Sequence, residues 1–102
     1  MKGAVQSKRE VLNRLHQSES TIRQLGVKRL GLFGSFIHDQ VTAESDVDFL
    51  VEFEPGQKSF DSFMALSFFL EELLQRPVEI VTTESLSRHI GPRILQSVEY
   101  VA

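Results

Sequence analysis

The residues of this sequence best suited to form a reactive site are three acids and a glycine-serine pair. Gly34 and Ser35 end an apolar run, and after ten more residues Asp46 and Asp48 open a second one. The two-residue period of a strand places Asp46 and Asp48 on one face, about 7 Å apart. Glu79 interrupts a third apolar run, where a buried acid requires a cation or another partner. The pattern predicts that carboxylates and a tight turn meet at neighbouring strand ends.

These groups suit a magnesium ion that carries a phosphorylated ligand. Mg²⁺ prefers oxygen ligands and is usually held by one or two carboxylates plus substrate phosphates. Asp46 and Asp48 would supply that pair, and Glu79 as a third acid would allow two ions to bind. The glycine lets a phosphate approach the backbone, and the N–H groups and hydroxyl at Ser35 can donate to it. Taken singly, each feature also has a plain structural explanation: a turn, a solvated strand end, or a charge on an edge strand.

Helices and strands alternate along the chain in an order that would bring these residues together. Ser7 and Glu10 form a capping box for a helix, and Gly26 ends a second helical segment that restarts after a break at 18–21. The segment 36–42 is ambiguous and fits one or two helical turns. The expected helices cover 8–17, 60–75 after a Ser59 cap, a short stretch from Thr83 or Ser85 through Ile90, and Pro92 to about Val98; the expected strands cover 27–33, 46–53 and 78–82. The fold class is therefore α/β (α+β), with a small mixed β-sheet of at least three strands and helices packed on it.

Length and composition restrict the function further. The 102 residues fit a single domain over 1–102, and an apolar share of 41% with a charged share of 25% is typical of a globular protein. No apolar run approaches the ~18 residues of a membrane helix, and the N-terminus lacks the apolar core of a secretory signal, so we expect a cytoplasmic protein. The absence of cysteine excludes thiolate zinc sites and thiol nucleophiles. A net charge of −3 without a block of Lys or Arg argues against a long nucleic acid as ligand.

The remaining polar side chains carry weaker signals. The histidines show no metal-ligand spacing and are expected at the surface; they are His16, His38 and His89. One tyrosine and three arginines could contact a nucleotide, but a solvated surface position is the default expectation for them; they are Tyr100, Arg76, Arg88 and Arg93. The helix over 60–75 is apolar over far more of its circumference than the ~100° stripe of a surface helix, which leaves part of it for an interface.

The pattern of Gly34-Ser35, ten residues and Asp46-Val47-Asp48 resembles the signature of the polymerase-β-type nucleotidyltransferase superfamily. The runs over 45–51 and 77–82 resemble those of its minimal branch, the minimal nucleotidyltransferase (MNT) domains, and the resemblance covers the chain from about residue 20 to the end. It implies a mixed α/β sheet with helices packed on it. It also implies that Gly34 and Ser35 hold a triphosphate, that Asp46 and Asp48 bind magnesium, and that Glu79 is the third acid, which helps to activate the acceptor.

The same resemblance implies an activity and a partner. The family transfers a nucleoside monophosphate, usually AMP from ATP, to a hydroxyl and releases pyrophosphate. Many minimal members are similar to antitoxins paired with a HEPN-type RNase toxin, and some modify a tyrosine of that toxin. The leading hypothesis is therefore an enzyme, a magnesium-dependent protein adenylyltransferase that acts as the antitoxin, with Asp46, Asp48 and Glu79 as catalytic and metal-binding residues.

Two other functions stay open. A catalytically weak or inactive antitoxin could neutralise its partner by binding alone, because relatives often have Ala-Arg-Gly where this chain has Ile37-His38-Asp39, and commonly have Asp where it has Glu79. Nucleotidyl transfer to RNA or to an antibiotic is less favoured, since the chain is acidic and leaves no room for an acceptor-binding domain. Assembly as a homodimer or a hetero-oligomer is compatible with either.

Overall fold

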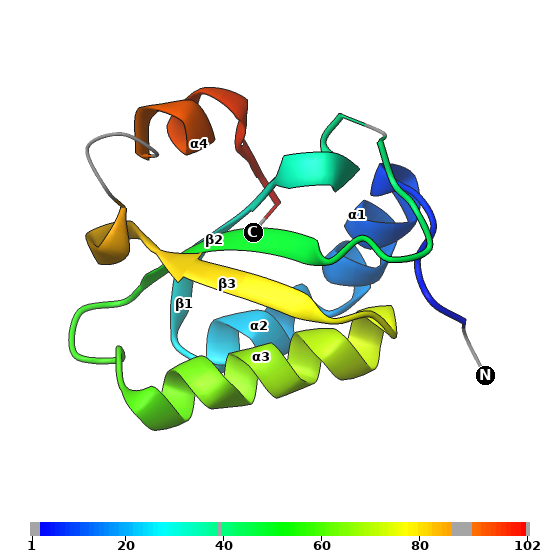
Figure 1. Cartoon of the computed structure of the whole chain (residues 1–102). Helices are drawn as coiled ribbons and strands as arrows, with labels where there is room; N and C mark the ends of the chain where they lie inside the picture. The colour runs from blue at the N-terminus through cyan, green and yellow to red at the C-terminus, as the bar shows by residue number, and fades with distance from the viewer. Residues whose placement is uncertain (1–2, 39, 87–90, 102) are drawn as a thin grey trace.

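The strands of this chain form one mixed sheet. The computed structural model describes residues 3–38, 40–86 and 91–101. Within these ranges the sheet has four strands in the order β3-β2-β1-β4 (Figure 1). The strands are β1 (Val27–Phe33), β2 (Val47–Phe53), β3 (Val78–Thr82) and β4 (Glu99–Tyr100). β1 runs antiparallel to β2 and to β4, whereas β2 and β3 are parallel. The predicted mixed α/β architecture is confirmed; β4 was not predicted, and β2 begins at Val47 rather than at Asp46.

The helices follow the predicted order, and their caps explain where two of them begin. They are α1 (Lys8–Gln17), α2 (Glu19–Gln24), α3 (Phe60–Leu74) and α4 (Gly91–Ser97), with 3₁₀ turns η1 (Gly34–Phe36) and η2 (Thr83–Ser85). At α1 the Glu10 amide donates to the Ser7 hydroxyl at 3.2 Å, and the Gln6 amide donates to the Glu10 carboxylate at 2.7 Å. At α3 the Ser62 amide donates to the Ser59 hydroxyl at 3.1 Å. Each cap pairs a helix-end N–H group that would otherwise lack a partner.

Three predicted boundaries need correction. The break between α1 and α2 is confined to Ser18, which serves as C-cap of the first helix and N-cap of the second. The ambiguous segment after β1 forms η1, which starts two residues earlier than expected, at Gly34. The short helix expected from Thr83 or Ser85 is only the single turn η2, after which Leu86 is extended; its expected end at Ile90 lies outside the described residues.

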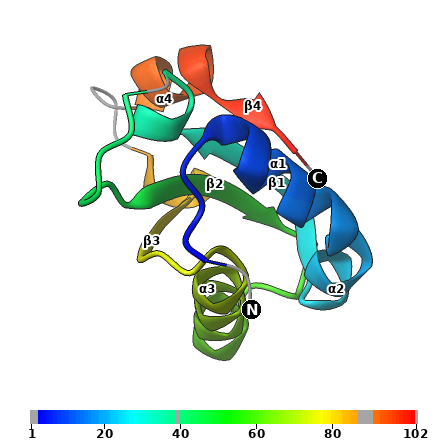
Figure 2. The ribbon, with the colours of Figure 1, turned by 90° about the vertical axis from the view of Figure 1, so that its right-hand side faces the viewer.

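The main core lies on one face of the sheet. Side chains of α1, α2 and α3 join those of the strands in a single buried cluster, which includes Leu15, Ile22, Leu30, Phe49, Val51, Leu66 and Leu70. The opposite face carries Phe33, Asp48 and Glu79, because the strand register pairs Phe33 with Asp48 and Asp48 with Glu79. α3 and α4 lie on opposite sides of the sheet (Figure 2). The sheet therefore separates an apolar layer from a face that carries the acids.

Leu50 shows that the second face is also partly covered. It belongs to the same face as Asp48, yet it is completely buried. The C-terminal segment contributes to this cover, since a Cβ at Gly31, opposite Leu50 in β1, would lie 2.4 Å from Val98 Cγ2. In the described ranges, no helix combines the length and the hydropathy needed to cross a membrane.

Candidate functional site

Asp48 and Glu79 lie side by side at the centre of the candidate site. They are register partners in the parallel strands β2 and β3, so their side chains emerge on the same face of the sheet. The charge of Glu79 acts on Asp48, so the two carboxyl groups lie close together. Asp48 is half-buried and Glu79 is exposed. The predicted pairing of an acid of the second strand with the third acid is thus present in the fold.

The surroundings of Asp48 disfavour its ionised form. Partial burial is the largest cause, followed by the negative charges of Glu79 and Asp46 and by the hydrogen bond with Glu79. Together they raise the pKa of Asp48 from its ordinary 3.8 to about 6. The site therefore has an excess of negative charge that a cation would relieve.

Gly34 brings the backbone of the first turn against Asp48. Its φ is +80°, in the region that favours glycine, and a Cβ at this position would lie 2.2 Å from Asp48 Oδ2. The turn η1 continues with the Ile37 amide donating to the Gly34 carbonyl and the Gln40 amide donating to the Ser35 carbonyl, at 3.1 and 3.0 Å. Ser35 is half-buried in this turn. Gly34 therefore meets Asp48 at the site, as the sequence pattern predicted.

Asp46 completes the acidic group from the loop before β2. It is exposed and lies one residue ahead of the strand, so its orientation depends on the loop and not on the sheet ladder. Its charge is nonetheless close enough to contribute to the raised pKa of Asp48. The three acids predicted from the sequence therefore interact electrostatically.

The residues fit a hard cation without forming a closed cage. Within the ranges that the structure describes, no three His, Cys, Asp or Glu side chains are gathered as a ready set of metal ligands. Such a set is not required for Mg²⁺, which keeps several waters and takes part of its shell from substrate phosphates. The neighbouring carboxyl groups of Asp48 and Glu79 supply oxygen ligands, and the raised pKa of Asp48 reflects an excess of negative charge at this point. Asp48 and Glu79, with Asp46 beside them, are the residues that would hold it.

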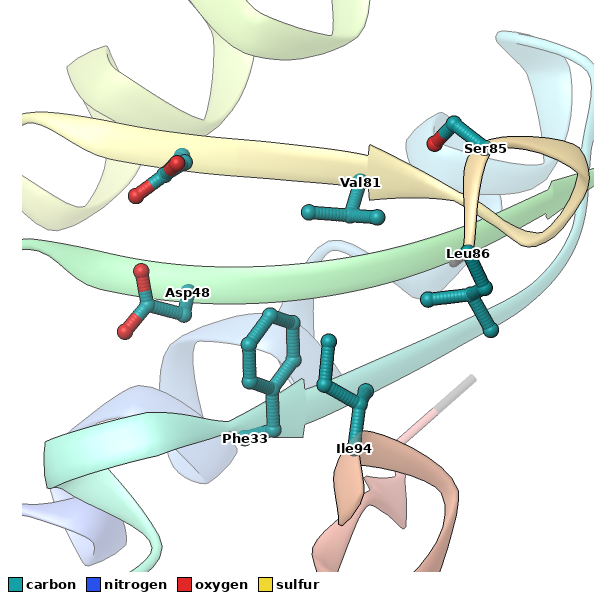
Figure 3. Close-up of a pocket in the computed structure, with 7 residues that line it drawn as sticks. Phe33, Asp48, Val81, Ser85, Leu86 and Ile94 are labelled. Atoms are coloured by element: carbon teal, nitrogen blue, oxygen red, sulfur yellow. The ribbon is translucent and has the colours of Figure 1, made fainter. Parts of the chain in front are cut away.

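A largely apolar cavity adjoins the acids, and the sequence reasoning did not identify it. It has a volume of about 510 Å³ and is lined by Phe33, Asp48, Glu79, Val81, Ser85, Leu86 and Ile94. Figure 3 shows Phe33 and Ile94 close to one another beside Asp48, with Val81 and Leu86 completing the wall. The spacing of Glu79 and Val81 could have placed Val81 on this face. The contribution of Ile94 depends on how α4 packs, which has no local signal.

The secondary candidates fall into three groups. His16 and His38 are exposed, as predicted, and so is Arg93. Tyr100 is 40% exposed and lies under the guanidinium of Arg29, whose Cζ is 4.3 Å from the ring centroid. The expectation of a surface position is wrong for Arg76, which is only 8% exposed. Two further candidates, His89 and Arg88, lie outside the described residues.

Comparison with known proteins agrees with this geometry. A family model described as the nucleotidyltransferase domain matches residues 9–101. The protein adenylyltransferase MntA of Thermococcus cleftensis is 38% identical over 86 residues, which cover 84% of this chain and 85% of that protein. A solved structure described as a minimal nucleotidyltransferase has a TM-score of 0.82 and 27% identity, covering 95% of this chain and 98% of the other. A toxin-antitoxin structure with AMP-PNP shares the fold at a TM-score of 0.65 and 17% identity, covering 93% of this chain and 72% of the other. The chain therefore belongs to the nucleotidyltransferase domain family, as a minimal member of it.

Proposed function

We propose that this nucleotidyltransferase transfers AMP from ATP to a hydroxyl of a partner protein in a magnesium-dependent reaction. The observation that carries the proposal is the contact of Asp48 with both Glu79 and Gly34, which joins the acids to the phosphate-binding turn. The similarity to a protein named protein adenylyltransferase supports AMP as the transferred group. A structural neighbour that contains AMP-PNP supports ATP as the donor.

The partner in this proposal is a HEPN-type toxin, for which the chain acts as the antitoxin. One structural neighbour is the MntA-HepT toxin-antitoxin pair, and this supports a partner of the same kind. The proposed place of action is the cytoplasm, where ATP and magnesium are available to such a pair.

The residues of the site have three roles in the proposed reaction: phosphate binding, metal binding and proton transfer. The backbone at Gly34 and the hydroxyl of Ser35 bind the phosphates, and Asp46, Asp48 and Glu79 hold the metal. Bound Mg²⁺ would neutralise phosphate charge and align the triphosphate. Glu79 takes the proton from the acceptor hydroxyl. The oxygen of that hydroxyl forms a bond to the α-phosphorus while the bond between the α-phosphorus and pyrophosphate breaks. Most of the acceleration comes from positioning and charge stabilisation.

The cavity beside the acids supports tyrosine as the acceptor. Its walls are mostly apolar, formed by Phe33, Val81, Leu86 and Ile94, and they adjoin the carboxyl groups of Asp48 and Glu79. Ser85 also lines the cavity, but its hydroxyl proton is already used, because it donates to the Thr82 carbonyl at 2.9 Å. A phenol has an apolar ring and one hydroxyl at its tip, so the ring can fill the cavity while the oxygen lies at the acids.

The test is a transfer assay with the partner toxin. The protein is incubated with ATP labelled at the α-phosphate, magnesium and a HEPN-type toxin, and the toxin is then digested and its labelled peptide identified. We expect AMP on a tyrosine of the toxin, and its loss in the Asp46→Asn/Asp48→Asn variant or when magnesium is chelated. An equal absence of label with the wild type and the double variant would refute the enzymatic proposal.

Neutralisation by binding alone is the second candidate, and the surface of α3 favours it. Phe60 and Phe68 are 77% and 62% exposed, and both aromatic side chains are available for a partner to cover. Under this alternative the Asp46→Asn/Asp48→Asn variant still neutralises the toxin in cells. Loss of neutralisation with the complex still intact would exclude it.

A further inference from the structure

Arg76 is a buried arginine that binds three backbone carbonyls from distant parts of the chain. It follows Gln75, whose left-handed conformation (φ 57°) ends α3, and it precedes β3. Its Nε donates to the Val5 carbonyl at 2.6 Å, and its Nη1 donates to the carbonyls of Thr42 and Ser45 at 3.0 and 2.9 Å. A buried guanidinium stays in place only when its donors are paired, so these bonds fix its position.

Two of these bonds hold the turn that leads to Asp46. Thr42 and Ser45 close this turn, with the Thr42 amide donating to the Ser45 hydroxyl at 2.8 Å and the Ser45 amide donating to the Thr42 carbonyl at 3.1 Å. Arg76 binds the carbonyls at both ends of it. One side chain from the segment between α3 and β3 therefore binds both ends of the turn.

The backbone on the other side of Asp46 is held by the residue next to Arg76. The Val47 amide donates to the Pro77 carbonyl at 3.0 Å. Ser45 and Val47, the two neighbours of Asp46, are thus bonded to the consecutive residues Arg76 and Pro77. Because Asp46 precedes β2, these bonds fix the backbone from which its exposed carboxylate projects.

Arg76 also touches the other half of the site. Its Cζ lies 5.3 Å from the centroid of the Phe36 ring, and Phe36 is fully buried at the end of the turn that carries Gly34 and Ser35. A guanidinium over an aromatic face is attracted by the ring and resists displacement. One side chain therefore contacts both the turn proposed to bind phosphate and the loop proposed to present a metal ligand.

We propose that Arg76 is a positioning residue that orients Asp46 toward the metal shared with Asp48 and Glu79. The inference rests on the proposed function, in which Asp46 is a metal ligand. Arg76 does not itself contact substrate in this arrangement. It binds the Ser45 carbonyl and packs on the Phe36 ring. These two contacts keep the loop before Asp46 at a fixed distance from the turn of Gly34 and Ser35. Second-layer groups of this kind typically change metal affinity or activity by about 10- to 100-fold when they are removed.

Arg14 offers a matched control. It is also a buried arginine, 9% exposed, and its guanidinium also binds backbone carbonyls, those of Leu73 at 2.9 Å and Gly3 at 2.6 Å. These carbonyls belong to α3 and the N-terminal segment, not to the loop before Asp46. Arg14→Met and Arg76→Met therefore both remove a buried guanidinium together with its bonds to backbone carbonyls, but only the second affects the site.

The experiment compares metal binding in the wild type, Arg76→Met and Arg14→Met, each at a temperature where circular dichroism shows it folded. Mn²⁺ is the probe, and its binding with AMP-PNP is followed by electron paramagnetic resonance, without turnover. We expect the Mn²⁺ dissociation constant to rise about 10- to 100-fold in Arg76→Met and to stay within about twofold in Arg14→Met. Equal constants for Arg76→Met and the wild type, or equal rises in both variants, would overturn the positioning role. A wild type that binds no Mn²⁺ would refute the proposed function and this inference together.

A second variant and a second measurement cover the case in which Arg76→Met does not fold. Arg76→Lys keeps the positive charge. In arginine, two nitrogens of the guanidinium donate to three carbonyls, whereas lysine offers only one ammonium nitrogen. We expect an intermediate rise in the Mn²⁺ dissociation constant. In the same variant, amide hydrogen exchange without ligand should quicken at Val47 and leave α1 unchanged. Wild-type exchange at Val47 together with wild-type metal affinity would count against the proposal.

Discussion

The backbone of Gly34 lies so close to Asp48 that a Cβ at position 34 would be 2.2 Å from Asp48 Oδ2. Such a separation is far inside van der Waals contact, so the glycine is required by its neighbour as well as by its positive φ. The contact places the end of β1 directly beside the acid of β2 that is paired with Glu79.

Gly34→Ala should abolish transfer while Gly56→Ala should not. Both glycines have nearly the same backbone conformation, with φ of +80° and +79°, but a Cβ at Gly56 would meet nothing within 4 Å. Both variants therefore carry the strain of a left-handed alanine, about 1 kcal/mol of unfolding free energy. Only Gly34→Ala also displaces Asp48, and we expect its rate to fall by about 100-fold or more.

Urea unfolding and the transfer assay, run on both alanine variants, check this prediction. A rate for Gly34→Ala within a few-fold of that for Gly56→Ala would show that the closeness of Gly34 to Asp48 has no role in the reaction.

Asp48→Asn should stabilise the metal-free protein at pH 7. The folded protein raises the pKa of Asp48 from 3.8 to about 6. Between those values the folded state binds more protons than the unfolded chain, so stability falls as the pH rises through this window. Because Asp48 is only half-buried, we expect a gain of about 1 kcal/mol for the variant, or roughly 4–8 °C in Tm. Thermal unfolding at pH 7 and pH 4 measures it.

The gain from Asp48→Asn should shrink at pH 4, where most of the wild-type carboxyl is already protonated. Glu54→Gln, at an exposed acid of the turn after β2, is the control and should change Tm little at either pH. A destabilised Asp48→Asn at pH 7 would contradict the prediction.

Metal affinity should fall as the pH is lowered through about 6. A metal ligand must be deprotonated, and the pKa of Asp48 lies near 6 because of burial and the nearby charges of Glu79 and Asp46. Below that pH each unit should weaken Mg²⁺ binding by up to about tenfold, since the cation must displace a proton. Isothermal titration with magnesium and AMP-PNP at pH 5, 6, 7 and 8 checks this. The same affinity at pH 5 and pH 8 would show that Asp48 is not a ligand.

Val81→Phe should raise the KM for the protein acceptor and leave nucleotide binding unchanged. Val81 lines the cavity of about 510 Å³ beside Asp48 and Glu79, and a larger side chain would fill part of the space proposed for the tyrosine ring. We expect an increase of about tenfold or more in KM, with AMP-PNP affinity within about twofold of the wild type. A selective loss of nucleotide affinity would instead place the adenine in the cavity.

Phe68→Ser should weaken the complex with the toxin. Phe68 is 62% exposed on α3, and an aromatic side chain that anchors the centre of an interface contributes about 2 kcal/mol, or about 30-fold in Kd. The folded state should be unaffected or slightly stabilised, because little apolar surface is buried there. Surface plasmon resonance against the immobilised toxin gives Kd for both forms. An unchanged Kd would show that the partner binds elsewhere.

The sequence alone determined most of the secondary structure and singled out the residues of the candidate site. Local rules were sufficient for this part: capping serines at Ser7 and Ser59, two-residue periodicity in β2 and β3, and a glycine after β1. The same periodicity singled out Asp48 and Glu79 as acids in apolar strands. These signals depend on residues a few positions apart, so they can be read without knowing which strands are neighbours.

Only the tertiary structure decided which of these residues meet. The parallel pairing of β2 with β3 brings Glu79 beside Asp48, and the packing of α4 adds Ile94 to the cavity wall. It also reversed the expectation for Arg76, which is buried against carbonyls more than 30 positions away and not solvated at the surface. Strand order and long-range hydrogen bonds depend on the balance of burial and desolvation over the whole chain, and no short stretch of sequence contains that information.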